Sequence, residues 1–153
     1  DNNEPKDFVV LASSTKLLRN VDYSYRQITH EKTEITFVST EVLDKLKKVH
    51  NVTDEKTASW KFNRDFEALE RTRKQLFTTD KRCLKISTIQ SFKGWESPSV
   101  IIILENDTIS DNTNYLPTSP QAIYTAITRA RENMYIVNIG NNTYHNFFYN
   151  QSL

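Results

Sequence analysis

The side chains best suited to chemistry lie in one short segment, Lys85 to Glu96. An apolar run ends there in small hydroxyls, followed by a lysine, a glycine and a carboxylate: Thr88, Gln90, Ser91, Lys93, Gly94 and Glu96. In open α/β sheets, ligands bind at the carboxyl ends of strands. Hydroxyl and backbone N–H groups suit phosphate oxygens, and a glycine permits close backbone approach. The segment predicts a phosphate-binding strand end, and an ordinary polar turn after a strand is the alternative.

A second segment, Tyr124 to Asn133, carries two arginines. Its helical spacing predicts a narrow stripe of apolar and small residues, suited to close packing on a sheet: Ile123, Ala126, Ile127 and Ala130. Arg129 falls beside this stripe, so packing would fix the direction of its guanidinium, as a phosphate contact requires. The alternative is an arginine whose stem packs while its head meets a carboxylate. Arg131 is better placed for solvent.

Several kinds of site are excluded by residue type. The chain has two glycines, Gly94 and Gly140. A GxxxxGK[ST] phosphate loop and a GxGxxG dinucleotide loop therefore cannot form. The histidines and the single cysteine are far apart and show no metal-ligand spacing. A catalytic triad assembled in space stays open.

Composition describes one ordinary domain. The chain has 153 residues, 37% hydrophobic and 25% charged, with a net charge of +1. This balance neither demands nor excludes nucleic acid. Cys83 has no partner for a disulfide within the chain, and no apolar run is long enough for a membrane helix, so we expect a cytoplasmic protein. The chain begins at Asp1 and its single methionine is Met134, which favours a fragment of a longer protein.

Strand and helix patterns alternate along the chain. Apolar or alternating runs predict strands at 8–12, 34–39, 84–89, 100–105 and 134–139. Helical spacing and capping residues predict helices after Ser14, from Thr40, around 66–76, from Pro120 and around 144–148. The order predicts an α/β domain with a mainly parallel sheet. The run 100–105 is the most apolar, so we expect it at the centre of the sheet.

Together the two segments resemble motifs V and VI of the UvrD/Rep-like superfamily-one helicases. Thr88 to Glu96 looks like motif V, a T-x-H-x-x-K-G-x-E run, and Ile123 to Ala130 looks like motif VI, close to Y-V-A-x-T-R-A. The resemblance implies that residues 1–153 are the C-terminal, second RecA-like domain of such a motor. It would be a three-layer domain of the P-loop NTPase type that lacks its own P-loop, with a small helical insertion at about 40–80.

The resemblance also implies roles for individual residues. Arg129 would be the arginine finger that reaches the γ-phosphate of ATP, and Glu96 would contact the ribose. Lys93 and Gly94 would shape the motif V turn. Phosphates of the translocating strand would meet Thr88, Gln90 and Ser91. ATP and Mg²⁺ would be bound mainly by the N-terminal RecA-like domain of the same protein. The other partner would be single-stranded DNA, with RNA possible, and no membrane is implied.

The chain also departs from the family pattern. Gln90 replaces the usual histidine of motif V, and the insertion is short. Its aromatic residues, Trp60, Phe62 and Phe66, could face a partner, but a role in the insertion's own core is the preferred interpretation. Two other functions stay open: a non-catalytic RecA-like module that binds nucleic acid or protein, and an unrelated α/β enzyme.

Overall fold

The centre of the molecule is a five-stranded sheet in which every neighbouring pair is parallel. The computed structural model describes residues 4–53, 58–106 and 119–151. The strand order is β2-β3-β1-β4-β5. The strands are β1 (Phe8–Ala12), β2 (Thr33–Ile35), β3 (Leu84–Thr88), β4 (Ser97–Glu105) and β5 (Ala130–Ile139).

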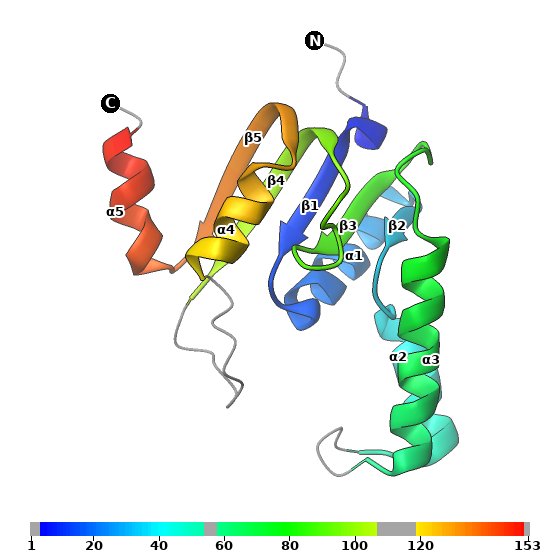
Figure 1. Ribbon diagram of the computed structural model, residues 1–153. Helices are drawn as coiled ribbons and strands as arrows, with labels where there is room; N and C mark the ends of the chain where they lie inside the picture. Colours follow the sequence, from blue (N-terminus) through cyan, green and yellow to red (C-terminus); the bar gives the residue numbers. More distant parts are fainter. Residues whose placement is uncertain (1–3, 54–57, 107–118, 152–153) are drawn as a thin grey trace.

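Helices cover both faces of this sheet, which gives three layers (Figure 1). They are α1 (Thr15–Thr29), α2 (Thr40–His50), α3 (Trp60–Leu76), α4 (Pro120–Ile127) and α5 (Asn142–Gln151), and a 3-10 turn, η1 (Pro5–Asp7), precedes β1. α1 packs against β1 and β3 on one face, and α4 packs against β4 and β5 on the other. The α/β class and the parallel sheet expected from the sequence are confirmed. Within the described ranges, no helix has the length and apolar character needed to cross a membrane.

Three of the five strands have boundaries that differ by three or more residues from those predicted. β1 has the predicted bounds, but β2 ends at Ile35, and β4 and β5 begin earlier than expected, at Ser97 and Ala130. The run 100–105 lies in β4, which is an inner strand covered on both faces as expected, but β1 and not β4 holds the middle position. Both strands are apolar on both faces, so burial alone could not rank them.

The helix of the second chemical segment is also shorter than the spacing suggested. α4 ends at Ile127, and Ala130 is the first residue of β5, not part of the helical stripe. The Thr128 hydroxyl donates to the Thr125 carbonyl (3.0 Å), and Arg129 Nε donates to the same oxygen (3.1 Å). These bonds satisfy a carbonyl of the last turn, where a helix leaves acceptors open.

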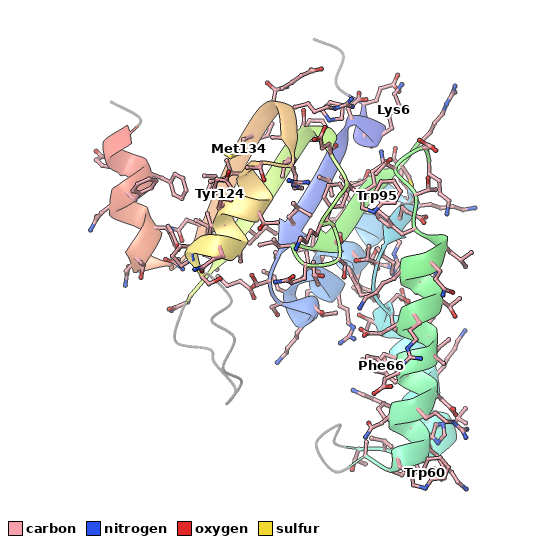
Figure 2. The ribbon with its side chains drawn as sticks, in the orientation of Figure 1. Lys6, Trp60, Phe66, Trp95, Tyr124 and Met134 are labelled. Atoms are coloured by element: carbon pink, nitrogen blue, oxygen red, sulfur yellow. The ribbon has the colours of Figure 1, made fainter. Side chains whose placement is uncertain are left out.

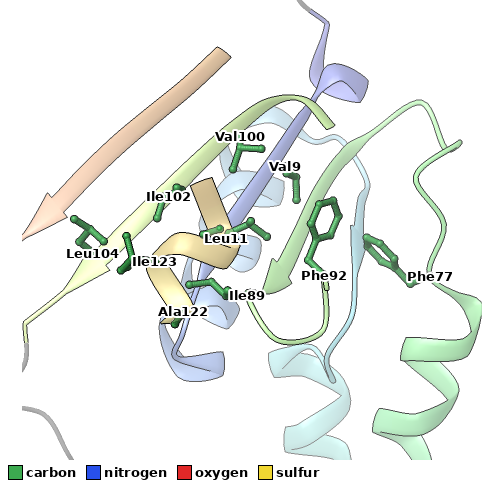
Figure 3. Close-up of a cluster of buried hydrophobic side chains, with 11 residues drawn as sticks. Val9, Leu11, Phe77, Ile89, Phe92, Val100, Ile102, Leu104, Ala122 and Ile123 are labelled. Atoms are coloured by element: carbon green, nitrogen blue, oxygen red, sulfur yellow. The ribbon is translucent and has the colours of Figure 1, made fainter. Parts of the chain in front are cut away.

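Alternating side chains build a separate core on each face. Val9 and Leu11 of β1 point to the α4 face, whereas Val10 and Ala12 point to the α1 face. On the α4 face, buried residues of β4, of α4 and of two connecting segments pack against Val9 and Leu11 and form the α4-face core (Figure 3). These residues are Phe77, Ile89, Phe92, Val100, Ile102, Leu104, Ala122, Ile123 and Ala126. This two-sided alternation explains why β1 and β4 are continuous apolar runs.

The connection from β3 to β4, residues 89–96, crosses the sheet without a helix. β3 and β4 lie on either side of β1, so this connection passes over β1, and a parallel connection ordinarily needs about a dozen or more residues. Here Ile89 and Phe92 are buried against the sheet and provide the covering that a helix would supply. A turn then closes with the Trp95 N–H bonded to the Phe92 carbonyl (3.0 Å), and Gly94 takes φ +93° at its third position. A positive φ at this position is typical of a type II turn.

The packed helices α2 and α3 form an arm beside the sheet (Figure 1). Its own small core holds Val38, Leu43 and Phe62, with Phe66 packed against it. Ser59 caps α3, since its Oγ accepts from the Phe62 N–H (3.3 Å). The interpretation of Phe62 and Phe66 as core residues is confirmed, whereas the Trp60 side chain is 66% exposed.

We expect Phe92→Ala to lower the free energy of unfolding by about 3–5 kcal/mol, because it leaves a cavity in the α4-face core. Phe92→Leu should cost markedly less. Urea denaturation followed by circular dichroism measures both variants. Equal stability of wild type and Phe92→Ala would show that the crossover does not pack on the sheet.

The positive φ of the turn at position 94 should favour glycine over other residues. An added Cβ would meet nothing within 4 Å, so a substitution there creates no clash within the domain. Gly94→Ala should therefore cost only the strain of a positive φ, about 1–2 kcal/mol, and Gly94→Asn should cost less, since asparagine tolerates positive φ. Thermal melting of the two variants tests the order.

Candidate nucleotide and nucleic-acid edges

The Arg129 guanidinium is half-buried and held by three oxygen atoms. Nε donates to the Thr125 carbonyl (3.1 Å), Nη2 to the Thr128 hydroxyl (3.0 Å) and Nη1 to the Trp95 carbonyl (3.3 Å). None of these partners is a carboxylate, and within residues 4–53, 58–106 and 119–151 no carboxylate forms an ion pair with Arg129. A guanidinium carries five N–H donors. Two of them have no acceptor among the described residues, so the positive charge is oriented but not neutralised there.

Arg129 lies where β4 and β5 begin. Its carbonyl accepts from the Ser97 N–H (3.0 Å), which ties the first residue of β4 to the residue before β5. The next residues form a β-bulge, because Ser97 pairs with Ala130 but Ser99 pairs with Asn133. A bulge changes the direction of the side chains beside it. Arg131 lies in this bulge and is exposed, as the sequence indicated.

A polar hollow of about 230 Å³ opens at this amino edge of the sheet. Its lining includes Glu96, Ser97, Arg131, Lys6 and Lys85. Figure 2 labels Lys6 and Trp95, which come from η1 and from the end of the crossover. The exposed carboxylate of Glu96 can accept hydrogen bonds from hydroxyl groups. The hollow carries charges of both signs, since Asp7 and Asp80 also line it.

Lys85 is the unusual member of this hollow. Its side chain is 3% exposed, and Nζ donates to the Lys6 carbonyl. Burial lowers the pKa of the Lys85 ammonium below its ordinary value. Lys85 begins the first segment, but no role was predicted for it or for Lys6. A lysine within an apolar strand was the available signal for Lys85, whereas nothing local distinguishes Lys6.

The hydroxyls of the first segment lie at the opposite, carboxyl edge. The Thr88 hydroxyl donates to Ser91 Oγ (2.9 Å) and accepts from the Ser91 N–H (3.2 Å). Thr88 and Ser91 are half-buried, and Gln90 between them is exposed. Together they make a small polar surface whose hydroxyls are fixed by each other. Such a surface suits contact with phosphate oxygens.

The same edge holds the start of α1. Ser14 caps this helix, since its Oγ accepts from the Leu17 N–H (3.2 Å), as the sequence predicted. The Ser14 N–H donates to a carboxylate oxygen of Glu105 at the end of β4 (2.9 Å). The backbone donor of the cap is thus already paired with a carboxylate of the same domain.

The expectation of one functional edge needs correction. The first segment was expected to form a single phosphate-binding strand end. Trp95 and Glu96 do lie beside Arg129, but Thr88, Gln90 and Ser91 lie at the other end of β3, with Lys93 and Gly94 between the two groups. The reason is topological, because the chain must return from the carboxyl end of one strand to the amino end of the next.

The donor set of these edges fits a phosphate better than a metal ion. Among the described residues, no group of three or more His, Cys, Asp or Glu side chains could hold a metal. Arg129 and the hydroxyls instead supply N–H and O–H donors. Cys83 lies apart from them, and burial raises the pKa of its thiol, which disfavours the nucleophilic thiolate.

Similarity to curated proteins and to solved structures is low. No curated protein matches the chain. Among solved structures, the chain is similar to the C-terminal domain of a possible DNA helicase from Lactobacillus plantarum WCFS1. The two share 17% identity, the match covers 91% of this chain and 77% of that one, and the TM-score is 0.33.

The family match extends over both segments. The model of the viral superfamily 1 RNA helicase core domain matches residues 10–138, which include the crossover, α4 and Arg129. The superfamily-one assignment made from the two motifs is therefore confirmed, whereas the narrower UvrD/Rep resemblance stays a prediction. The chain belongs to the viral superfamily 1 RNA helicase core family.

Proposed function

We propose that this chain is the second RecA-like motor domain of an ATP-dependent helicase and that Arg129 is its arginine finger. Family membership supports the helicase class. The assignment of Arg129 as the finger rests on its hydrogen bonds. Its guanidinium donates to two backbone carbonyls and one hydroxyl, and it has no carboxylate partner among the described residues. A charge held in this way is ready for a phosphate supplied from outside the domain.

In this proposal ATP lies between the amino edge and a neighbouring RecA-like domain. That domain supplies the P-loop and the ligands of Mg²⁺, which neutralises charge on the phosphates when bound. The two remaining N–H groups of Arg129 donate to the γ-phosphoryl oxygens. Glu96 lies on the same edge and accepts from ribose hydroxyls. Lys93 and Gly94 shape the turn that brings Trp95 and Glu96 to this edge.

The carboxyl edge contacts the nucleic acid. Thr88, Gln90 and Ser91 offer hydroxyl and amide groups to the phosphates of a single strand. The matched family is one of RNA helicases. This favours RNA as the bound nucleic acid over the DNA expected from the UvrD/Rep resemblance. The crossover joins the amino edge to the carboxyl edge. A displacement of Trp95 and Glu96 during ATP turnover can therefore move the Thr88–Ser91 turn. Stepping along the strand would follow from this connection.

The central test is Arg129→Ala in the whole protein that contains the P-loop domain. ATP turnover should fall about 10³–10⁵-fold, because charge on the transferring phosphoryl group loses its stabilisation. Nucleotide binding, measured with a fluorescent ATP analogue, should change little. Arg129→Lys should remain strongly impaired, since an ammonium cannot reproduce the fixed fork of a guanidinium.

A matched control is Arg71→Ala, which removes an arginine with a 79% exposed side chain on α3. It should leave turnover unchanged. Residues 1–153 alone should show no ATP turnover, because their two glycines cannot form a P-loop. Normal turnover in the Arg129→Ala protein would reject the finger assignment, whereas absence of turnover in the wild-type whole protein would favour a non-catalytic binding module.

A further inference from the structure

A groove runs along α2, away from the two edges already described. Its first part, about 270 Å³, lies between α1 and α2 and is lined by Lys16, Arg19, Asn20, Thr40, Asp44 and Lys47. Its second part, about 380 Å³, shares Asp44 and Lys47 and continues past Lys48 to Asn51 at the far end of α2. Among the residues that the structure describes, Asp44 is the one acidic member of either lining. We call these two parts the α2 groove.

The α2 groove begins beside the carboxyl edge. α1 follows β1 directly, and the last residue of β1, Ala12, pairs with Thr88 of β3. The Ile89 N–H also donates to the Ala12 carbonyl (3.0 Å), so the Thr88–Ser91 turn lies next to the start of α1. Lys16 stands in the first turn of that helix and lines the groove. A strand leaving Thr88–Ser91 would therefore meet the groove next.

The α2 groove leads toward the free end of the arm, where an aromatic side chain is exposed (Figure 2). The end of α2 lies beside the start of α3, since His50 Nε2 is 3.1 Å from an Asp65 carboxylate oxygen. Trp60 is the first residue of α3 and is 66% exposed. The Arg64 guanidinium lies 5.3 Å from the centre of its ring and the Lys61 ammonium 5.9 Å.

We propose that the α2 groove and Trp60 form a second single-strand contact, which carries the nucleic acid from Thr88–Ser91 along the arm. Lys16, Lys47 and Lys48 bind phosphates, and Trp60 stacks on a base at the end of the path. α2 is about 16 Å long at 1.5 Å per residue, so the path holds a few nucleotides. This inference rests on the proposed function, because it extends the nucleic-acid path assigned there.

The chemistry of this surface fits nucleic acid better than a protein. A groove with cations along its length, ending at an exposed aromatic ring, is the arrangement that single-strand binding surfaces use. Cations near the Trp60 ring add attraction to a phosphate that accompanies a stacked base. A large exposed apolar patch is the feature that marks a protein-binding surface, whereas Trp60 is bordered here by the cations of Lys61 and Arg64.

The first test measures binding of residues 1–153 to a fluorescein-labelled, unstructured single-stranded RNA by anisotropy at several salt concentrations. Replacing Lys16, Lys47 and Lys48 by alanine should weaken binding about fivefold per lysine at 0.1 M salt and reduce the salt slope by about 0.7 each. Lys45→Ala is the matched control, since Lys45 is an exposed lysine of α2 outside the groove lining. An unchanged slope in the triple variant would overturn the proposal.

The second test addresses the aromatic end. Trp60→Ala should weaken RNA binding about fivefold or more through lost stacking, and Trp60→Phe should retain most of the affinity. In a Trp95→Phe background, Trp60 is the remaining tryptophan, and its fluorescence should be quenched on RNA addition. Both side chains are exposed, so circular dichroism should show unchanged folding.

Motif V variants separate this inference from the proposed function. If Thr88→Val and Ser91→Ala weaken RNA binding while the groove and Trp60 variants do not, the proposed function stands and the second contact is rejected. The same RNA and a single-stranded DNA of equal sequence are compared throughout. If Trp60→Ala abolishes capture of a protein but leaves binding of both oligonucleotides unchanged, the arm serves protein docking and the proposal fails.

Discussion

Parallel pairing of every strand is the constraint on which the other features depend. In such a sheet each connection must return across the full length of the strands before the next one starts. The segment between β3 and β4 does this with residues 89–96, held down by Ile89 and Phe92 in the α4-face core. Its polar residues consequently divide between the two ends of the sheet. Thr88 and Ser91 remain at the carboxyl edge, and Glu96 reaches the amino edge beside Arg129.

This division suits a motor domain. The nucleotide and the nucleic acid are different ligands that must bind at separate places and still affect each other. A short, packed crossover between the two edges transmits displacement better than a long loop, because packed segments move as units and not by continuous deformation. Under our proposal the Phe92 core contact and the Gly94 turn therefore serve coupling as well as folding.

The arm formed by α2 and α3 is also held rigidly by packed side chains. Its small core of Val38, Leu43 and Phe62 gives α2 and α3 a fixed relation to each other. Arg19 of α1 donates to the Val38 carbonyl (2.8 Å) and lies 5.8 Å from the centre of the Phe66 ring, so the arm is also tied to the body. A rigid arm can hold its groove in line with the carboxyl edge, as a continuous nucleic-acid path requires.

The sequence by itself determined the fold class, three helix starts and the two segments that carry the chemistry. Period-two and helical spacing are local, and capping residues such as Ser14 and Ser119 act on their own helices, so these features were readable from the chain. Which strand is central and which edge receives each polar residue depend on pairing between distant segments. The same is true of the hollow around Lys85 and of the α2 groove. Only the tertiary structure decided these, because contacts between residues far apart in the chain leave no periodic signal in it.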